Sequence, residues 1–249
     1  MRRSMLTLML SLSIAPAMAG TPQINVGSMY DYLPADASNL LKRVRNSGDA
    51  TAFVRVEISQ VHYAADGSST ETAVDAAALA RNAADAHGLI ASPGRMIIPA
   101  KGQQATRLVH RGSRDVEQYY RVRFIPVVPD GREFALTEEE IAQYKGSLSA
   151  KVNVFTGYGT LMFVAPADAH YQTAVDDLPA GTRLRNDGNA TVVLDNLRQC
   201  PVDTEQRCAP GIRVHLRPGQ SHTVARQPGL YQRLELVEGS TRRPLDLHD

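Results

Sequence analysis

Short stretches in which apolar and polar side chains alternate run along most of this chain. Within residues 53–61, for example, Val54, Val56 and Ile58 alternate with charged side chains, and the same period recurs in residues 212–217. Successive side chains of a strand point to opposite faces, so this period of two predicts half-buried strands with one wet face. Because Gly, Pro and Asn turns separate the strands without regular intervening helices, we expect an all-β protein built from antiparallel sandwiches.

One longer pattern occurs twice in the chain. Residues 43–51 and 183–191 both read Arg, apolar, Arg, Asn, polar, Gly, Asp or Asn, Ala, Thr, and both lead into β-branched runs. Asn-x-Gly turns the chain, because Asn and Gly tolerate positive φ at low cost. Each copy therefore predicts a strand end, a turn and a new strand. Chance convergence of turn segments is one explanation, but so extended an agreement favours duplication of one domain type.

Two stretches depart from the strand pattern. Residues 71–87 are rich in Ala and are expected to belong to a long loop, with a short helix as the alternative. In the segment 129–147, Thr137 followed by Glu140 has the spacing of a capping box, in which each side chain bonds the backbone N–H of the other residue. This spacing predicts a helix over 138–145.

The stretch 147–164 changes character halfway. Its first half has one apolar face, formed by Leu148, Ala150, Val152 and Val154, whereas its second half is apolar on both faces. A strand with this pattern leaves a sheet edge and enters an interior. Taken alone, the pattern is typical of a final strand that covers its own core. The alternative is a strand lent to another domain, which would share ladder hydrogen bonds and receive these side chains in an open groove.

The N-terminus has the layout of a secretory signal peptide. Arg2 and Arg3 precede a short apolar run, and an Ala-Met-Ala cleavage pattern ends at Ala19. We therefore expect residues 1–19 to be removed on export. No later stretch approaches the ~20 apolar residues of a spanning helix, so no membrane insertion is expected. Without Arg2 and Arg3 the 27 basic residues fall to 25 against 26 acidic ones, a net charge of −1, which does not favour nucleic-acid binding.

The residues that could carry catalysis or bind a metal are few. Cys200 and Cys208 are the only cysteines, and an oxidising compartment favours a disulfide between them. No third metal ligand lies near them, and the seven histidines lack the spacing of a metal pair. The chain also lacks Gly-x-Ser-x-Gly, His-Glu-x-x-His and a Gly-rich phosphate loop. We therefore expect no enzymatic activity, metal or cofactor.

Several motifs, by their order and spacing, resemble those of one family. They are Arg-Asn-Ser at 45–47, Tyr-Tyr-Arg-Val-Arg-Phe at 119–124, Gly-Thr-Leu-Met-Phe-Val-Ala-Pro at 159–166, the Asn-Asp-Gly-Asn-Ala-Thr stretch at 186–191, and the cysteine pair. From about Ile24 to the C-terminus the sequence resembles the periplasmic chaperones of the chaperone–usher pilus pathways. It is most similar to the alternate group that serves the common pilus.

This resemblance implies two immunoglobulin-like β-sandwich domains arranged at an angle, expected here at residues 20–166 and 167–249. It implies a periplasmic chaperone that stabilises pilus subunits by donor-strand complementation, without a cofactor, and delivers them to an outer-membrane usher. The sequence does not decide whether the free chaperone forms a dimer that caps its donor strand. The positions that match the subunit-binding donor face are Leu148, Ala150, Val152 and Val154, with Thr156 as a further candidate.

One feature of the family is missing from this sequence. Better-known relatives anchor the subunit's terminal carboxylate with an Arg in the first strand and a Lys in the last. Here the first strand, expected over 24–30, has no basic residue, and Leu161 stands where the Lys would fall. A carboxylate in a partly desolvated cleft still favours a forked donor. The candidate anchors by sheet proximity are Arg107, Arg121, Arg123 and Lys151, although each also fits a solvated charge on a strand face.

A structural pilus subunit or adhesin is the leading alternative, since it would also be exported, immunoglobulin-like and disulfide-bonded. Such a subunit would lack one strand and carry a donor extension near its N-terminus, whereas two complete sandwiches are expected here. A carbohydrate-binding sandwich or periplasmic enzyme fits less well, because the chain has no Trp and only 6% aromatic residues.

Overall fold

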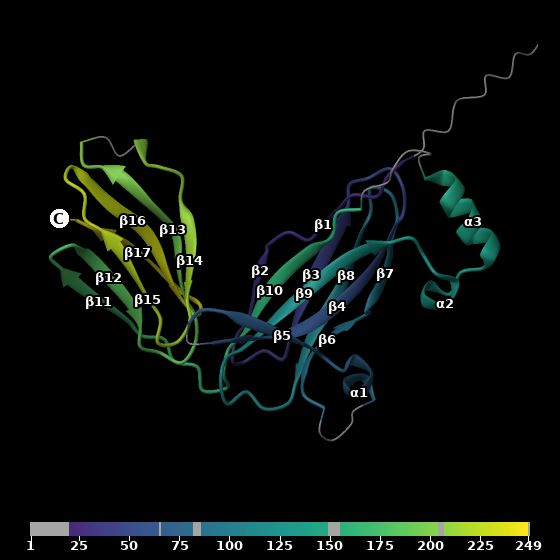
Figure 1. Ribbon diagram of the computed structural model, residues 1–249, viewed down its shortest axis with the longest axis horizontal. Coiled ribbons are helices and arrows are strands. Elements are labelled where there is room, and N and C mark those ends of the chain that lie inside the picture. The colour runs from purple at the N-terminus through teal and green to yellow at the C-terminus, as the bar shows by residue number, and fades with distance from the viewer. Residues whose placement is uncertain (1–19, 65, 82–85, 149–154, 204–206, 249) are drawn as a thin grey trace, which may run out of the picture.

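A computed structural model describes residues 20–64, 66–81, 86–148, 155–203 and 207–248 (Figure 1). The expected signal peptide, residues 1–19, lies outside the described residues. The strands form two groups that meet at an angle (Figure 1) and are joined by the segment 165–172.

The first group is a sandwich of two sheets. One sheet has the order β1 (Ile24–Asn25), β3 (Asn39–Asn46), β8 (Gln103–Arg111), β6 (Gly88–Ser92). The other has the order β2 (Tyr30–Leu33), β10 (Tyr158–Val164), β9 (Gln118–Val127), β4 (Ala52–Tyr63), β5 (Ser69–Ala73), with β7 (Arg95–Ile98) paired to β4. The alternating patterns that predicted strands place Val54, Val122 and Phe124 in the core between the sheets, each with no exposed surface.

The second group is a smaller sandwich with its own core. Its three-stranded sheet has the order β11 (Thr173–Leu178), β12 (Gly181–Asn186), β15 (Ser221–Ala225). Its four-stranded sheet has the order β14 (Ile212–Leu216), β13 (Val192–Pro201), β16 (Leu230–Glu238), β17 (Thr241–Leu247). Leu184, Leu194 and Leu236 fill the space between them. Two sheets with these neighbour relations are the immunoglobulin-like arrangement, so the predicted fold class is confirmed.

The repeated sequence pattern has the same structure in both sandwiches. Asn46 and Asn186 are fully buried, and each donates from Nδ2 to the carbonyl four residues later, at 2.7 and 2.9 Å. Each also accepts from the glycine N–H two residues later, at 3.0 and 2.9 Å. A Cβ on either glycine, Gly48 or Gly188, would overlap a neighbouring backbone carbonyl. Identical local chemistry at equivalent turns supports duplication of one domain type.

The helices lie outside the sheets. Of these, α3 (Glu138–Ser147) begins with the predicted capping box, and both reciprocal hydrogen bonds of Thr137 and Glu140 are present. The helix extends past the predicted end, because Leu148 N–H bonds Tyr144 O and closes a further turn. Ser147, the first residue of the strand-like stretch, therefore belongs to the helix, whereas Leu148 has extended backbone conformation. A further short helix, α2 (Gly131–Phe134), precedes α3 in the same segment.

Two other expectations are corrected by the structure. The Ala-rich segment is not one long loop, since β5 and the short helix α1 (Ala76–Ala80) occupy part of it. The expected first strand is divided between the two sheets as β1 and β2. Gly27 stands between them at φ 70°, with its N–H bonded to Asn25 Oδ1, and this turn redirects the chain from one sheet to the other.

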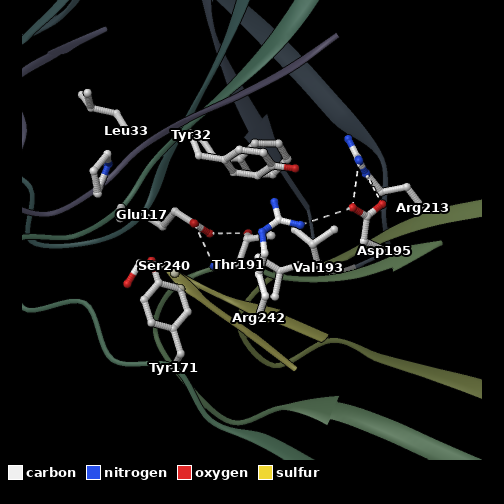
Figure 2. Close-up of a pocket in the computed structure, with 15 residues that line it drawn as sticks. Tyr32, Leu33, Glu117, Tyr171, Thr191, Val193, Asp195, Arg213, Ser240 and Arg242 are labelled. Atoms are coloured by element: carbon white, nitrogen blue, oxygen red, sulfur yellow. Dashed lines mark hydrogen bonds and ion pairs between the residues drawn. The ribbon is translucent and has the colours of Figure 1, made fainter. Parts of the chain in front are cut away.

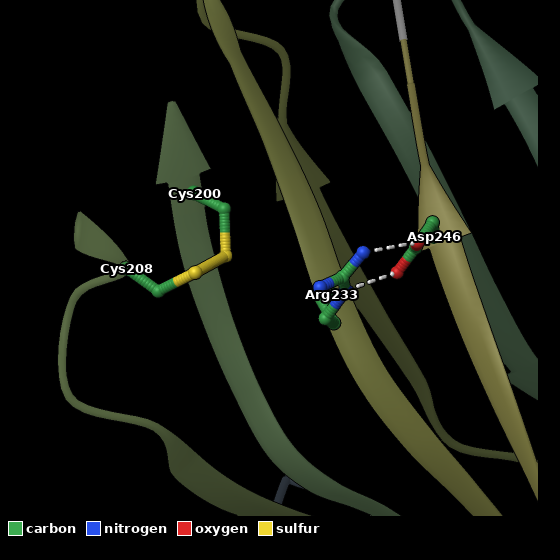
Figure 3. The surroundings of a disulfide bond; sticks show 4 residues. All are labelled: Cys200, Cys208, Arg233 and Asp246. Atoms are coloured by element: carbon green, nitrogen blue, oxygen red, sulfur yellow. Dashed lines mark hydrogen bonds and ion pairs between the residues drawn. A yellow bond between two sulfur atoms is a disulfide. The ribbon is translucent and has the colours of Figure 1, made fainter. Parts of the chain in front are cut away.

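The predicted disulfide between Cys200 and Cys208 is present at the end of β13 (Figure 3). It lies near the Arg233–Asp246 ion pair, which joins β16 to β17. The bridge closes a short loop of the second sandwich, so its expected role is structural.

Replacing both cysteines by Ala should lower the free energy of unfolding by about 2.5 kcal/mol, the loop-closure entropy of so short a ring. Binding of a pilus subunit, the client that the sequence resemblance implies, should be unchanged, because Cys200 stands about 20 Å along β13 from Val193 at the junction of the two sandwiches. Urea unfolding measures the first effect and co-purification of a client the second. Loss of binding by a folded double variant would contradict a purely structural bridge.

Candidate functional site

Strand β10 is paired on both sides along only part of its length. It pairs with β9 from Tyr158 to Val164, but with β2 only from Leu161 onward, where Leu161 N–H bonds Met29 O at 2.9 Å. Among the described residues, no strand pairs with the second edge of β10 at 158–160. Backbone groups at that edge are therefore open to an added strand.

The two-sided apolar half of the predicted strand is confirmed as part of the interior. Met162 and Val164 have no exposed surface and belong to the main core of the first sandwich. On the opposite face, Leu161 and Phe163 pack against Val61 in a separate cluster. This strand therefore holds a fixed position between β2 and β9, with its free edge at its beginning.

The candidate donor residues divide into two groups. Ala150, Val152 and Val154, together with the candidate anchor Lys151, lie outside the described residues. The others flank this segment. Leu148 packs partly buried against the cluster of Phe53, Phe134 and Tyr144. Thr156 is exposed and lines a shallow hollow between the start of β10 and the chain at 21–25.

Two of the candidate anchors lie together beside the start of β10. Arg121 and Arg123 of β9 pair in register with Leu161 and Gly159. Because Gly159 has no side chain, the aliphatic part of Arg121 lies over it, where a Cβ would be 3.3 Å from Arg121 Cδ.

Both guanidinium groups share a single carboxylate. Glu71 of β5 is 2.6 Å from Arg123 and 3.5 Å from Arg121. Burial opposes the ionisation of Glu71, but the two arginines outweigh it and lower the pKa of this carboxyl. Two cations against one anion leave guanidinium donors available for a second carboxylate.

The structure separates Arg107 from this group. It projects from β8, in the other sheet of the sandwich, paired in register with Leu41. Its side chain is exposed on the outer face of that sheet. Of the three candidate anchors that the structure describes, it thus brings together Arg121 and Arg123 and places Arg107 elsewhere.

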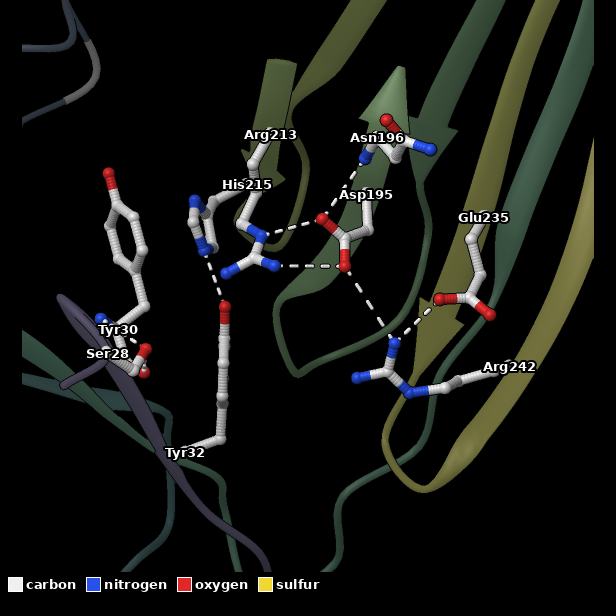
Figure 4. Close-up of polar contacts among 9 residues, drawn as sticks. All are labelled: Ser28, Tyr30, Tyr32, Asp195, Asn196, Arg213, His215, Glu235 and Arg242. Carbon is white, nitrogen blue, oxygen red and sulfur yellow. Dashed lines mark hydrogen bonds and ion pairs between the residues drawn. The ribbon is translucent and has the colours of Figure 1, made fainter. Parts of the chain in front are cut away.

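An aromatic cluster lies at the junction of the two sandwiches. Tyr30 and Tyr32 of β2 are partly exposed on the side facing the second sandwich, where His215 of β14 packs against both rings (Figure 4). The His215 ring also stacks on Phe163. Tyr32 Oη and His215 Nε2 are 2.6 Å apart. Burial lowers the pKa of His215 to about 4, so its ring is neutral at neutral pH.

The second sandwich contributes a balanced group of charges to this junction. Arg213 forms a two-pronged ion pair with Asp195, at 2.8 and 3.0 Å, and Arg242 binds Glu235 at 2.6 Å (Figure 4). A pocket of about 270 Å³ between the sandwiches is lined by Asp195, Arg213 and Arg242 together with Tyr32 (Figure 2). Sequence reasoning missed these residues, because the contacts join strands far apart in the chain and no local pattern marks them.

The orientation of the sandwiches is fixed by further contacts across the junction. Glu117 accepts hydrogen bonds from Thr191 N–H at 2.8 Å and Thr191 Oγ1 at 2.6 Å (Figure 2). Arg114 Nε donates to the carbonyl of Ala165 at 2.8 Å, within the connection itself. These bonds hold the free edge of β10 and the second sandwich in one relative position.

A buried ion pair lies beneath the aromatic cluster. Lys42 of β3 crosses the sandwich to Asp31 of β2, with Nζ 2.9 and 2.8 Å from the two carboxylate oxygens and 2.7 Å from Ser28 O. Their side chains are 5% and 9% exposed. Since Asp31 stands between Tyr30 and Tyr32, the pair fixes the strand that carries both rings. The sequence did contain a signal, because Lys42 falls on the same face as buried Val44.

The site offers a strand edge and forked donors. The edge can extend the sheet by main-chain hydrogen bonds, and the arginine pair beside it can bind a carboxylate. Within the described residues, no helix has the length and apolar character to cross a membrane.

Comparisons with known proteins agree with this picture. No protein-family model matches the chain. It is 26% identical over 230 residues to a protein of Escherichia coli O7:K1 named probable fimbrial chaperone EcpB, covering 91% of this chain and 90% of that protein. The resemblance to pilus chaperones that the sequence predicted is confirmed.

Solved structures show the same fold. The class 5 fimbriae chaperone CfaA superimposes with a TM-score of 0.54 at 16% identity, covering 91% of this chain and all of that one. A Salmonella enterica structure of the SafA pilin in complex with the SafB chaperone matches with a TM-score of 0.51 at 14% identity, covering 90% of this chain and 95% of the matched chain. The two-sandwich arrangement is thus that of pilus chaperones.

Proposed function

We propose that this protein is a periplasmic chaperone that binds and stabilises pilus subunits by donor-strand complementation and delivers them to an outer-membrane usher. Its similarity along most of its length to proteins named fimbrial chaperones supports the proposal. The SafB chaperone, which has the same fold, binds a pilin in its solved complex. Delivery to an usher is the step that this class of chaperone would perform next.

The observation that carries the proposal is the half-open edge of β10. From Leu161 onward β10 lies between β2 and β9, but before Leu161 it pairs with β9 alone. A client strand added at 158–160 would therefore continue the sheet without displacing β2. The chain enters this edge from the segment that contains Ala150, Val152 and Val154. We infer that these three residues, with Thr156, face the client.

The proposed domain organisation follows the two sandwiches of the fold. We propose a signal peptide at 1–19, a client-binding domain at 20–166 and a second immunoglobulin-like domain at 167–249. Export to the periplasm supplies the oxidising conditions in which the Cys200–Cys208 bridge is stable. A self-capped dimer would bury the same edge that a client occupies.

The function is tested by purifying the tagged protein from the periplasm of its host and identifying what remains bound. A pilus subunit, present in an amount equal to the chaperone, is the expected result. Recovery of the chain without any subunit from pilus-producing cells, or with an unrelated class of protein in equal amount, would overturn the proposal. A dimer of the chain alone in cells without subunits, which dissociates when subunit is supplied, would identify the self-capped form.

We propose Arg121 and Arg123 as the anchor for the subunit's terminal carboxylate. They lie beside Gly159 and Leu161 of β10. An added strand would have to end there, because Leu161 N–H is already bonded to Met29 O. The two guanidinium groups can bind that carboxylate with charge-assisted hydrogen bonds, each contributing about 1.5–3 kcal/mol.

The double variant Arg121→Ala/Arg123→Ala should release a bound subunit to a competing, differently tagged wild-type chaperone at least about tenfold faster. Arg107→Ala removes the same type of side chain from the other sheet and should leave the exchange rate unchanged. Both exchange rates are measured by mixing each purified chaperone–subunit complex with the competing chaperone and following how much subunit co-purifies with each tag over time. Equal rates for the double variant and the wild type would remove the pair as the anchor.

A further inference from the structure

The four-stranded sheet of the first sandwich contains no acidic residue on any of its strands. Strands β1, β3, β6 and β8 carry five Lys and Arg side chains and neither Asp nor Glu. Lys42 is turned inward to Asp31, and Arg111 donates to Leu79 O at 3.0 Å. The remaining three, Arg43, Arg45 and Arg107, are exposed, and their side chains have no ion-pair or hydrogen-bond partner among the described residues.

These three arginines form one group, named here the basic face. Arg43 and Arg45 alternate with buried residues on β3, so they share the outer side about 7 Å apart. Arg107 lies on the neighbouring strand opposite Leu41, one diagonal step from Arg43. Leu41 itself is 47% exposed, so a large apolar side chain lies among the charges.

The other sheet of this sandwich differs, because the arginines on its outer face have partners. On the other sheet of the same sandwich, Arg55 and Arg95 share Glu133, and Arg121 and Arg123 share Glu71. Like charges placed close together on neighbouring strands repel and do not stabilise the sheet. With the signal peptide removed, the whole chain has nearly equal numbers of basic and acidic residues. A general excess of positive charge therefore does not account for the basic face.

We propose that the basic face docks an acidic patch on a folded protein partner distinct from the client. The flat face of guanidinium forks around an exposed leucine has the composition of a protein interface, where Arg is enriched and Lys depleted. A carboxylate from the partner would bond each fork in two-pronged geometry. The two sheets of a sandwich present opposite outer faces, so this partner and a client next to Arg121 could be bound at once.

The chemistry is tested first with poly-L-glutamate as the probe, on the full mature chain. Wild type should bind it with an affinity that falls at least about tenfold between about 50 and about 200 mM salt, since exposed charges are screened. Arg43→Gln/Arg45→Gln/Arg107→Gln should lose that binding with an unchanged melting temperature. Arg183→Gln/Arg185→Gln/Arg233→Gln removes three ion-paired arginines, the same charge, and should retain it. Equal binding by both triple variants would overturn the proposal.

The class of partner is tested in the periplasm by placing a photo-crosslinking residue at Leu41. The control carries the same residue at exposed Val175 of the second sandwich. A protein that crosslinks to position 41 but not to position 175 is then purified. It should bind the wild type at least about tenfold more tightly than it binds the Arg43→Gln/Arg45→Gln/Arg107→Gln variant. The absence of a crosslink at position 41, or equal binding of that protein by the variant, would contradict the proposal. Preferential binding of the face to phosphatidylglycerol vesicles or to DNA would also overturn it.

Discussion

Val154→Asp is expected to abolish capture of the pilus subunit while leaving the chaperone folded, and Val152→Asp should do the same. Both residues lie outside the described part of the chain, so the expectation rests on the sequence alternation and on the open edge of β10 that follows. Burying one valine contributes about 1.5–3 kcal/mol. A carboxylate at the same place loses that contribution and has to be desolvated without a partner, so the affinity should fall more than about a hundredfold.

Asn153→Asp is the matched control, since it adds the same charge one residue away, on the polar face of the same segment. Capture should persist in this variant. Subunit levels in the periplasm and the amount that co-purifies measure the effect, and thermal unfolding shows that each variant folds. Normal subunit levels with Val154→Asp would contradict donor-strand binding. Equal loss with Asn153→Asp would show that the charge, and not the face, is responsible.

The features predicted correctly from the sequence are those encoded by neighbouring residues. A period of two places Val54 and Val122 in the core wherever the strands pair. The turns at Asn46 and Asn186 depend on side-chain bonds to backbone groups only two and four residues away. The capping box of α3 is also local, since it joins Thr137 to Glu140. In each case the residues that determine the structure lie within one short window.

The features that were missed depend on residues distant in sequence. The sequence near the first strand does not show which sheet it joins. Its second part, β2, pairs with β10, which is more than a hundred residues away in the chain. The predicted end of α3 is too early, because Ser147 and Leu148 alternate like a strand, whereas Ser147 lies in the helix and Leu148 N–H still bonds Tyr144 O. Contacts of Tyr32 with His215 require the relative position of two domains. No window of local sequence contains that information.

Lys42→Met should lower the free energy of unfolding by about 3–5 kcal/mol, because it leaves the Asp31 carboxylate buried without its partner. Burial already raises the pKa of Asp31, and Lys42 opposes that rise. Without Lys42 the pKa in the folded state should rise further above its unfolded value. A carboxyl group of this kind stabilises the fold when it is protonated, and this contribution is lost as pH rises through the folded pKa. The deficit of the variant should therefore be smaller near pH 4 than at pH 7.

Two comparisons separate the buried pair from a general effect of losing a lysine. Lys101→Met removes the partner of Asp49, which is 2.7 Å away, but both side chains are mostly exposed, so the loss should stay below about 1 kcal/mol. Asp31→Leu/Lys42→Met replaces both buried charges by apolar groups and should recover most of the stability. Urea unfolding at both pH values measures all four proteins. If Lys42→Met costs no more than Lys101→Met, the Asp31 pair does not hold β2, and the aromatic cluster would need another support.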